Sequence, residues 1–283
     1  MNVILSLGID AYIIHMPYVT IHISDGIGNR LFQIAAMLGY AERHGHTPIF
    51  VKKFIQPSNY TNVDATSLST LFPTIPTLYG TVDWTEMNMK PEDAFTHIDL
   101  PYSPDHICLI GFFQSELYFP RNGIQCTLSA VPVPPLPYEN AAFLHVRRGD
   151  YLSPYTAHHR VDLTDYYRHA IQFLPVGCHI FVCSDDIPWC RTELPLLCGD
   201  GAVLEFIDCD TITTLAIMMR CRYGGICANS TFSWWGGYFN HTPSSIILFP
   251  DTWGYPPLPP IRDLYPSWGL QLPVGFVEKN DML

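Results

Sequence analysis

The spacing of apolar residues changes along the chain in a repeating order, from short continuous runs to runs with helical periodicity. Residues 18–23 form an apolar, β-branched run that predicts a strand, and residues 24–28 form a glycine-containing loop after it. From about Asn29 to His44 the apolar residues fall on one face of a helix, and Gly45 is suited to end that helix. The first half of the chain therefore opens with a strand, a loop and a helix.

The second half repeats this order several times. Short apolar runs predict strands at 142–146, 179–183, 225–228 and 246–249, and helical spacing predicts helices at 165–174, 212–221 and from 232 to 239. A strand followed by a crossover helix and another strand predicts a parallel sheet covered on both faces. Two such halves predict an α/β protein with two doubly wound domains and a cleft between them.

A proline-rich stretch marks the expected division between the halves. Residues 131–138 contain four prolines in eight residues, which is incompatible with a helix or a central strand and predicts a stiff connector. We therefore expect one domain over 1–137, in which residues 1–16 form an extension, and a second domain over 138–283. Residues 255–260 are also rich in proline and should be irregular.

Composition and charge narrow the class of protein. Of the 283 residues, 48% are apolar and 14% are charged, which predicts a folded chain and excludes disorder. The net charge of −11 argues against broad binding to nucleic acid or to an anionic membrane. The first 24 residues lack a basic region and contain Asp10, so neither a signal peptide nor a membrane span is expected. A cytoplasmic protein is predicted, with peripheral attachment to a membrane as the alternative.

The chain has nine cysteines and no CxxC pair, so the spacing typical of a zinc ribbon is absent. Several of these cysteines lie within apolar runs, for example Cys183, Cys221 and Cys227. Buried free thiols in a reducing compartment are therefore expected.

Two adjacent arginines follow the buried strand at 142–146. Arg147 and Arg148 lie in the segment His-Val-Arg-Arg-Gly-Asp-Tyr, at the carboxyl end of a strand, where ligands bind in open α/β sheets. A guanidinium group offers a planar fork of donors that fits phosphate oxygens. The alternative is a structural ion pair between one of these arginines and Asp150 or another nearby acid.

Polar residues also follow the next two strands. Ser184, Asp185 and Asp186 could accept hydrogen bonds from ribose hydroxyls or from a purine edge, or could instead cap a helix. Residues 229–233, Asn-Ser-Thr-Phe-Ser, lie between a strand and a helix, where hydroxyls and free amide groups form an anion site. Simple capping is the alternative there, and the two roles can coexist.

Three weaker signals remain. The loop at 25–28 lacks the full GxGxxG spacing, although Gly26 and Gly28 would let the backbone approach a ligand closely. Asp208 and Asp210 form a DxD pair that could hold a divalent metal, but Asp210 is also well placed to cap the following helix, so no metal site is expected. His158 and His159 are predicted to lie in a solvated loop.

Taken in order, these segments resemble the α-1,2-fucosyltransferases, glycosyltransferase family eleven, over residues 20–255. The similarity implies a GT-B architecture, with two Rossmann-like domains facing across a cleft, the donor half following the proline connector and the acceptor half preceding it. It also implies inverting transfer of L-fucose from GDP-fucose to a glycan hydroxyl, O2 of a terminal galactose, without metal or other cofactor. A related GDP-sugar transferase of different linkage and a non-catalytic carbohydrate- or nucleotide-binding protein are the alternatives. The matching segments are residues 26–33, 111–119, 145–151, 166–167, 184–186 and 229–236, with Pro250 and Trp253 beyond them.

The resemblance also suggests a role for individual residues. Arg147 and Arg148 would meet the diphosphate, and Asn29 would lie across the cleft near the transferred sugar, so these three are the expected catalytic residues. The expected donor-binding residues are His145, Asp150, Ser184, Asp185, Asp186, Asn229, Ser230, Thr231, Phe232, Ser233, Gly26 and Gly28, with His145 and Asp186 near guanosine. Candidates for the acceptor-side base are Asp25, Glu116 and His159. Arg30 stands where many family members have Gln, a departure expected to bear on acceptor identity.

Overall fold

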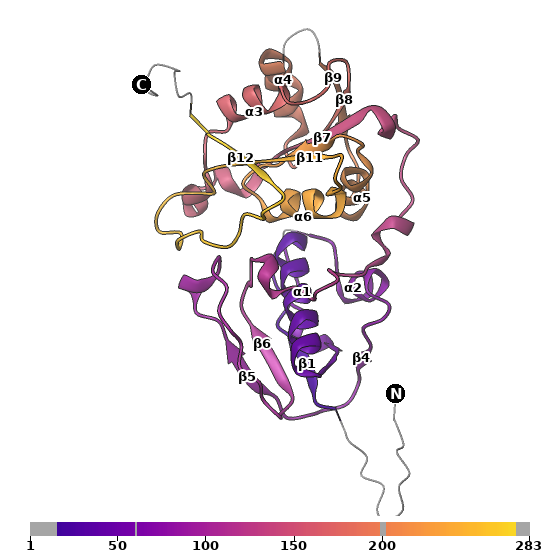
Figure 1. The fold of residues 1–283 in the computed structure, drawn as a ribbon, viewed down its shortest axis with the longest axis vertical. Coiled ribbons are helices and arrows are strands. Elements are labelled where there is room, and N and C mark those ends of the chain that lie inside the picture. The colour runs from indigo at the N-terminus through magenta and orange to yellow at the C-terminus, as the bar shows by residue number, and fades with distance from the viewer. Residues whose placement is uncertain (1–15, 60, 199–201, 276–283) are drawn as a thin grey trace, which may run out of the picture.

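The computed structural model describes residues 16–59, 61–198 and 202–275, and each half of the chain has one main parallel sheet (Figure 1). The first sheet has the order β2-β1-β6-β5, and a separate pair, β3-β4, lies in the same half. The strands of this half are β1 (Tyr18–Ile21), β2 (Thr47–Pro48), β3 (Phe50–Val51), β4 (Thr77–Leu78), β5 (Thr85–Asn88) and β6 (Ile107–Ile110). Its helices are α1 (Ile27–His44) and α2 (Ala65–Leu71). As expected, Gly45 ends α1 in the left-handed conformation, with φ at 71°.

The second sheet has six parallel strands in the order β12-β11-β10-β7-β8-β9. Counted within this half, the order is 3-2-1-4-5-6, the doubly wound arrangement in which ligands bind where the strand order reverses. That reversal lies between β7 and β10. The strands are β7 (Ala141–Val146), β8 (His179–Ser184), β9 (Val203–Ile207), β10 (Gly224–Ile226), β11 (Ile246–Pro250) and β12 (Leu270–Leu272), and the helices are α3 (Thr164–Ile171), α4 (Ile187–Cys198), α5 (Thr211–Arg220) and α6 (Thr231–Asn240).

Strand β7 is buried on both faces and contributes alternate side chains to two cores. Ala142 and Leu144 pack with residues of α3 and α4 on one face. Ala141 and Phe143 pack on the other face in a core that includes residues of α5 and α6. The second sheet is therefore covered on both faces, as the continuous apolar runs predict.

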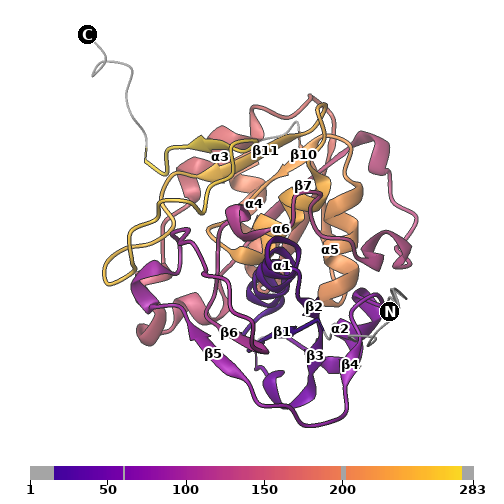
Figure 2. The same ribbon diagram turned by 60° about the horizontal axis from the view of Figure 1, so that its bottom comes forward.

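The core beneath α5 and α6 continues without interruption into the first half of the chain. Helices α1 and α6 lie side by side at the centre of the molecule (Figure 2). Phe32 of α1 packs against Trp234 and Trp235 of α6, and Phe119 stacks on Trp235 with ring centroids 5.1 Å apart. Trp235 Nε1 also donates to the Gly28 carbonyl at 2.9 Å. One hydrophobic core thus joins the two halves.

The α/β fold of GT-B type, with two Rossmann-like halves facing each other, is confirmed. All the elements expected in the second half are present, with ends shifted by a few residues. The short strands of the first half and β9 and β12 were not predicted, because runs of two to five residues carry little periodicity. Helix α4 was also not predicted, because it holds Pro195 in its interior. The domain boundary at 137/138 stays a prediction, and residues 1–15 of the expected extension lie outside the described residues.

All nine cysteines are free and six of them are buried, whereas Cys209 is exposed. Burial raises the pKa of the Cys108 thiol to about 12. None of the helices in the described part of the chain has the length and hydrophobicity that crossing a membrane requires.

Candidate functional site

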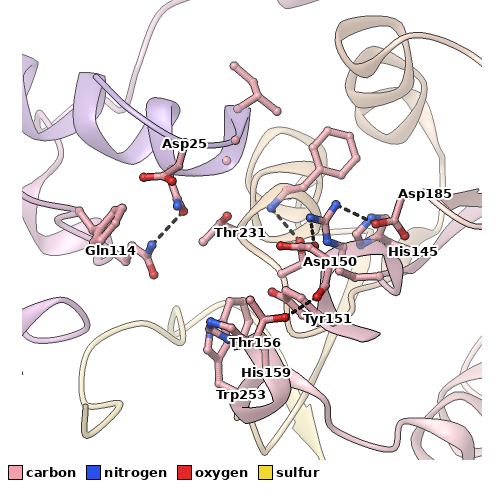
Figure 3. Close-up of a pocket in the computed structure, with 18 of the residues that line it drawn as sticks. Asp25, Gln114, His145, Asp150, Tyr151, Thr156, His159, Asp185, Thr231 and Trp253 are labelled. Atoms are coloured by element: carbon pink, nitrogen blue, oxygen red, sulfur yellow. Dashed lines mark hydrogen bonds and ion pairs between the residues drawn. The ribbon is translucent and has the colours of Figure 1, made fainter. Parts of the chain in front are cut away.

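A cavity of about 570 Å³ lies between the two halves, at the carboxyl ends of β1 and β6 on one side and of β7 and β10 on the other (Figure 3). This volume is in the range of small-molecule binding sites. The switch point of the second sheet opens into it, so the topology and the cavity indicate the same place.

Arg147 enters the cavity from the end of β7 and is held between two carboxylates. Its Nη1 lies 2.9 Å from Asp185 Oδ2, and its Nη2 donates to Asp150 Oδ1. The guanidinium also lies over the Tyr151 ring, 5.4 Å from the centroid. A guanidinium has five N–H donors, so these two ion pairs leave donors for a ligand. The structural ion pair that was the alternative interpretation therefore forms, and Arg147 still lines the cavity.

Arg148 makes different contacts from Arg147. Within the described chain it is outside the lining of this cavity and lines a neighbouring one of about 350 Å³. Its Nε lies 3.0 Å from Asp186 Oδ2, and its guanidinium carbon lies 4.1 Å above the Trp189 ring. Of the two arginines expected to meet the diphosphate, Arg147 lines the main cavity and Arg148 does not, among the residues that the structure describes.

The two aspartates after β8 also differ in whether they line the main cavity. Asp185 and Ser184 line the main cavity. Asp186 Oδ1 accepts from the Trp189 amide at 3.1 Å in the first turn of α4, so the capping alternative describes Asp186. Its other oxygen pairs with Arg148.

The segment before α6 is part structure and part cavity wall. Asn229 is buried and its amide nitrogen donates to the carbonyls of His159 and Trp253, both at 2.8 Å. Ser233 is fully buried and its hydroxyl bonds to the Ala228 backbone. In the described structure, neither of these two lines the cavity. Ser230, Thr231 and Phe232 do line it, and Ser230 caps α6 by accepting from the Phe232 amide.

Helices α1 and α6 both begin at this cavity. Gly26, the N-cap of α1, supplies no side chain, so the first amide groups of that helix are left for another acceptor. Gly26, Gly28 and Thr231 all line the cavity, so the positive ends of two helices meet there. A Cβ on Gly28 would lie 2.5 Å from Thr231 Oγ1 and 2.6 Å from the Phe232 amide nitrogen. The absence of a side chain at Gly28 therefore allows helix α6, in addition to any ligand, to approach closely.

His145 is buried beside this junction. Burial, together with the nearby charge of Arg147, lowers the pKa of its imidazole to about 3, so the ring is neutral at physiological pH. The ring centroid lies 5.2 Å from that of Phe232. Its Nδ1 is buried and has no hydrogen-bond partner among the described residues. Because His145 lines the cavity, this unsatisfied atom indicates a place for a ligand.

Two of the three candidate bases lie in the cavity wall. Asp25 and His159 line it, whereas Glu116 is not part of the wall in the described structure and its Oε2 accepts from Trp268 Nε1 at 2.9 Å. The prediction of a solvated loop is wrong for His159, which is partly buried and stacks on Tyr151. Burial lowers the pKa of His159 to about 4.

Arg30 serves the loop before α1. Its side chain is buried and donates to the backbone carbonyls of Asp25, Gln56 and Val63, at 2.8, 2.7 and 3.1 Å. Burial lowers the pKa of the guanidinium below its ordinary value. These contacts give Arg30 a role in loop structure, and it does not line the cavity formed by the described residues.

Some wall residues were not singled out from the sequence. Gln114 lies across the cavity from Asp150 and Asp185 (Figure 3), and its Nε2 donates to Asn29 Oδ1 at 2.9 Å. Phe112 lies beside it in the wall. Both belong to the 111–119 segment of the resemblance, which was the available signal. Thr156 and Trp253 complete the lower part of the view in Figure 3.

The DxD pair has a structural explanation for its second residue. Asp210 Oδ1 accepts from the amides of Ile212 and Thr213, each at 3.0 Å, and so caps α5. In the part of the chain that the structure describes, no three His, Cys, Asp or Glu side chains are grouped as metal ligands would be.

Comparison with known proteins adds sequence and fold relatives. Residues 137–257 match the model of glycosyl transferase family 11. The chain is 31% identical to an alpha-1,2-colitosyltransferase of Escherichia coli over 51% of this chain and 55% of that protein. It is 33% identical to the O-antigen biosynthesis glycosyltransferase WbnK of Escherichia coli over 40% of this chain and 39% of that protein. The chain thus spans about half the length, or less, of these curated relatives.

A solved structure, the fucosyltransferase NodZ from Bradyrhizobium, matches with a TM-score of 0.46 and 16% identity, over 78% of this chain and 93% of that one. The sequence matches are the stronger finding. The family match covers the segments that build the second-half side of the cavity, including those that carry His145, Arg147 and Thr231. The similarity to glycosyl transferase family 11 thus lies in residues 137–257, and the two curated relatives named here are glycosyltransferases.

Proposed function

We propose that this chain transfers L-fucose from GDP-fucose, with inversion, to O2 of a terminal galactose on a glycan acceptor, without a metal ion. One observation carries the proposal: Arg147 and the N-termini of α1 and α6 surround a single cavity at the switch point of the donor-half sheet. Helix N-termini and a guanidinium are the groups that hold a diphosphate in proteins.

The diphosphate needs stabilisation most when it leaves. As the bond from the fucose C1 to the β-phosphate oxygen breaks, its electron pair moves to that oxygen and negative charge grows there, while C1 gains oxocarbenium character. The Arg147 donors that Asp150 and Asp185 leave free, and the first amides of α6, would meet this charge. Donors already in place at a developing charge are typically worth about 3 kcal/mol each.

The acceptor hydroxyl must lose a proton as its oxygen attacks C1 from the face opposite the departing GDP. Asp25 is the base in this proposal. It lines the first-half wall, whereas His159 lies on the second-half wall, stacked on the Tyr151 ring. Asp25 has φ at 63°, a left-handed conformation that Asn also tolerates, so Asp25→Asn tests the role without altering the backbone.

We also place this activity in the cytoplasm. Nine free cysteines are typical of a protein in a reducing compartment. The net charge of −11 disfavours attraction to anionic membranes.

The test is GDP release from GDP-fucose with lactose as acceptor, followed by NMR of the product. We expect lactose-dependent release and a fucose linked to O2 of galactose, and we expect Asp25→Asn to lose transfer while still binding GDP. A product with another linkage would favour the related GDP-sugar transferase. GDP binding without any transfer would favour a non-catalytic binding protein.

A second donor is suggested by the relative named as a colitosyltransferase, to which the chain is 31% identical. Colitose would then replace fucose in the same site. Assays that supply GDP-fucose and GDP-colitose in separate reactions decide between the two, by the ratio of their kcat/KM values.

A further inference from the structure

The wall of the cavity opposite Arg147 has an unusual backbone. Among the described residues, Asp25 and Phe113 are the non-glycine residues with positive φ, at 63° and 54°. They follow β1 and β6, two paired neighbours in the first sheet, so both strained turns lie at the same edge of that sheet. Such strain persists where the surrounding structure enforces it and is common at ligand sites.

Two consecutive phenylalanines in the strained turn after β6 have different environments. Phe113 is fully buried and packs edge-to-face on Tyr118, with ring centroids 5.2 Å apart. Phe112, in contrast, is 37% exposed and lines the cavity. Part of the Phe112 side chain is therefore exposed to the cavity, on a wall whose described first-half residues include no arginine.

Buried hydrogen bonds hold this wall in place. Gln33 of α1 accepts from the Ser24 amide at 3.0 Å and donates to the Gly111 carbonyl at 3.2 Å, so one side chain ties both loops together. The backbone N–H of Gln114 donates to the Ala94 carbonyl, with a distance of 3.0 Å between nitrogen and oxygen. The wall is thus built before any ligand arrives, which is what a specific binding site requires.

The polar part of the wall is a pair of uncharged amides. Because Gln114 Nε2 donates to Asn29 Oδ1 at 2.9 Å, Gln114 Oε1 is left as an acceptor and Asn29 Nδ2 as a donor. Neighbouring hydroxyls on a sugar ring can each donate and accept, and they match such a donor–acceptor pair. The apolar face of the same ring suits an aromatic side chain.

We propose that Phe112 and the Gln114–Asn29 amide pair form the acceptor subsite, in which a hexopyranose ring stacks on Phe112 and two of its adjacent hydroxyls bond to the amides. Gln114 is a positioning residue for Asn29 in addition to contacting the sugar. This inference rests on the proposed function, and it places the acceptor next to Asp25, on the wall facing the diphosphate groups.

The test compares three readouts, with lactose as the probe: the KM for lactose, the Kd for GDP by calorimetry, and GDP release without acceptor. We expect Phe112→Ala to raise the lactose KM by about tenfold, the size of a lost aromatic contact, with the other two readouts within about twofold of wild type. Phe112→Tyr, which keeps the ring, should restore the KM. Phe173→Ala is the matched control, because Phe173 is 45% exposed and lies outside the cavity wall of the described structure.

Gln114→Glu provides a second, nearly isosteric variant. An ionised carboxylate cannot donate to Asn29 Oδ1. The side-chain amide of Asn29 would therefore rotate so that its Nδ2 donates to the new carboxylate, and this donor would no longer be available to the acceptor sugar. We expect the lactose KM to rise by about three- to tenfold, the effect of a lost hydrogen bond, with an unchanged Kd for GDP.

A wild-type lactose KM in both variants, or equal weakening of lactose and GDP binding, would overturn the subsite while leaving lactose-dependent transfer by the wild type intact. A wild-type protein that binds GDP and transfers nothing to lactose would instead overturn the proposed function, and this inference with it.

Discussion

Arg147 and Arg148 are adjacent and chemically identical, and both line the smaller cavity, yet of the two only Arg147 lines the main one. Arg147 lies between Asp150 and Asp185 and faces the main cavity, whereas Arg148 pairs with Asp186 over Trp189. Successive residues at the end of a strand point to opposite faces, which separates the two side chains. Of these two neighbouring side chains, Arg147 is therefore the one that can contact the leaving diphosphate.

We expect Arg147→Lys to lower kcat/KM for fucosyl transfer by about a hundredfold, because an ammonium keeps the charge and loses the planar fork of donors. The measurement is GDP release under saturating lactose and limiting GDP-fucose. Arg168→Lys is the control, since Arg168 is exposed and pairs with Asp165 on α3. Wild-type turnover in Arg147→Lys would rule out a leaving-group role for this side chain.

His145 should make stability depend on pH. Its folded pKa of about 3 lies below its ordinary value of 6.5, so the unfolded chain binds a proton that the folded chain does not. The stability that a neutral His145 contributes is present above about pH 6.5 and is lost as the pH falls from there toward about 3. His159, with a pKa of about 4, acts in the same direction.

Urea unfolding at a series of pH values between about 7 and 4 measures this dependence. We expect the free energy of unfolding to fall over that window, and to fall less steeply in His145→Asn, which removes the titrating ring. Equal slopes in the two proteins would show that His145 is not the source.

At the scale of elements, the site depends on how closely two helices begin side by side. Gly28 lies against the first residues of α6, and its carbonyl accepts from Trp235. The two helix N-termini reach one cavity because no side chain separates them at that point.

We expect Gly28→Ala to destabilise the protein by about 1–3 kcal/mol, since the added Cβ would overlap backbone and side-chain atoms of Thr231. GDP affinity should fall as well, because α6 must shift. Gly80→Ala is the matched control, as a Cβ there meets nothing within 4 Å. If thermal unfolding and GDP titration gave the same values for both variants and wild type, the close approach would have no energetic weight.

A helix cap also decides between two interpretations of the DxD pair. Asp210 caps α5, and Asn is an equally good N-cap residue, so Asp210→Asn should keep both stability and transfer activity. Asp210→Ala should cost about 1 kcal/mol of stability. We expect EDTA to leave transfer unchanged. Loss of activity in EDTA that Mn²⁺ restores would instead support a metal at this pair.

For the whole molecule, the continuous core makes the two halves one mechanical unit. Aromatic side chains from both halves, including Phe32, Phe119 and Trp235, pack together between the two sheets. Separating the halves would expose this cluster, so the cavity between them should keep its shape without a large opening motion.

We therefore expect a single unfolding transition that is the same by calorimetry, far-UV circular dichroism and tryptophan fluorescence. Trp235→Phe should lower the whole transition, by about 1–3 kcal/mol, because it leaves the buried Gly28 carbonyl without its donor. Trp84→Phe, in a partly exposed cluster with Phe54, should have a smaller effect. Two separate transitions would show that the halves fold independently.

The sequence by itself determined the α/β order of the second half, the end of α1 at Gly45 and the presence of Arg147 at a strand end, because each depends on local periodicity or on one residue's backbone preference. Only the tertiary structure decided which arginine faces the cavity, that Asn229 and Ser233 serve the loop, that Gly28 contacts α6 and that His145 is neutral. These properties depend on contacts between segments as distant as Gly28 and Trp235. No local pattern records such pairings, because side-chain direction and burial are set by the packing of the two halves.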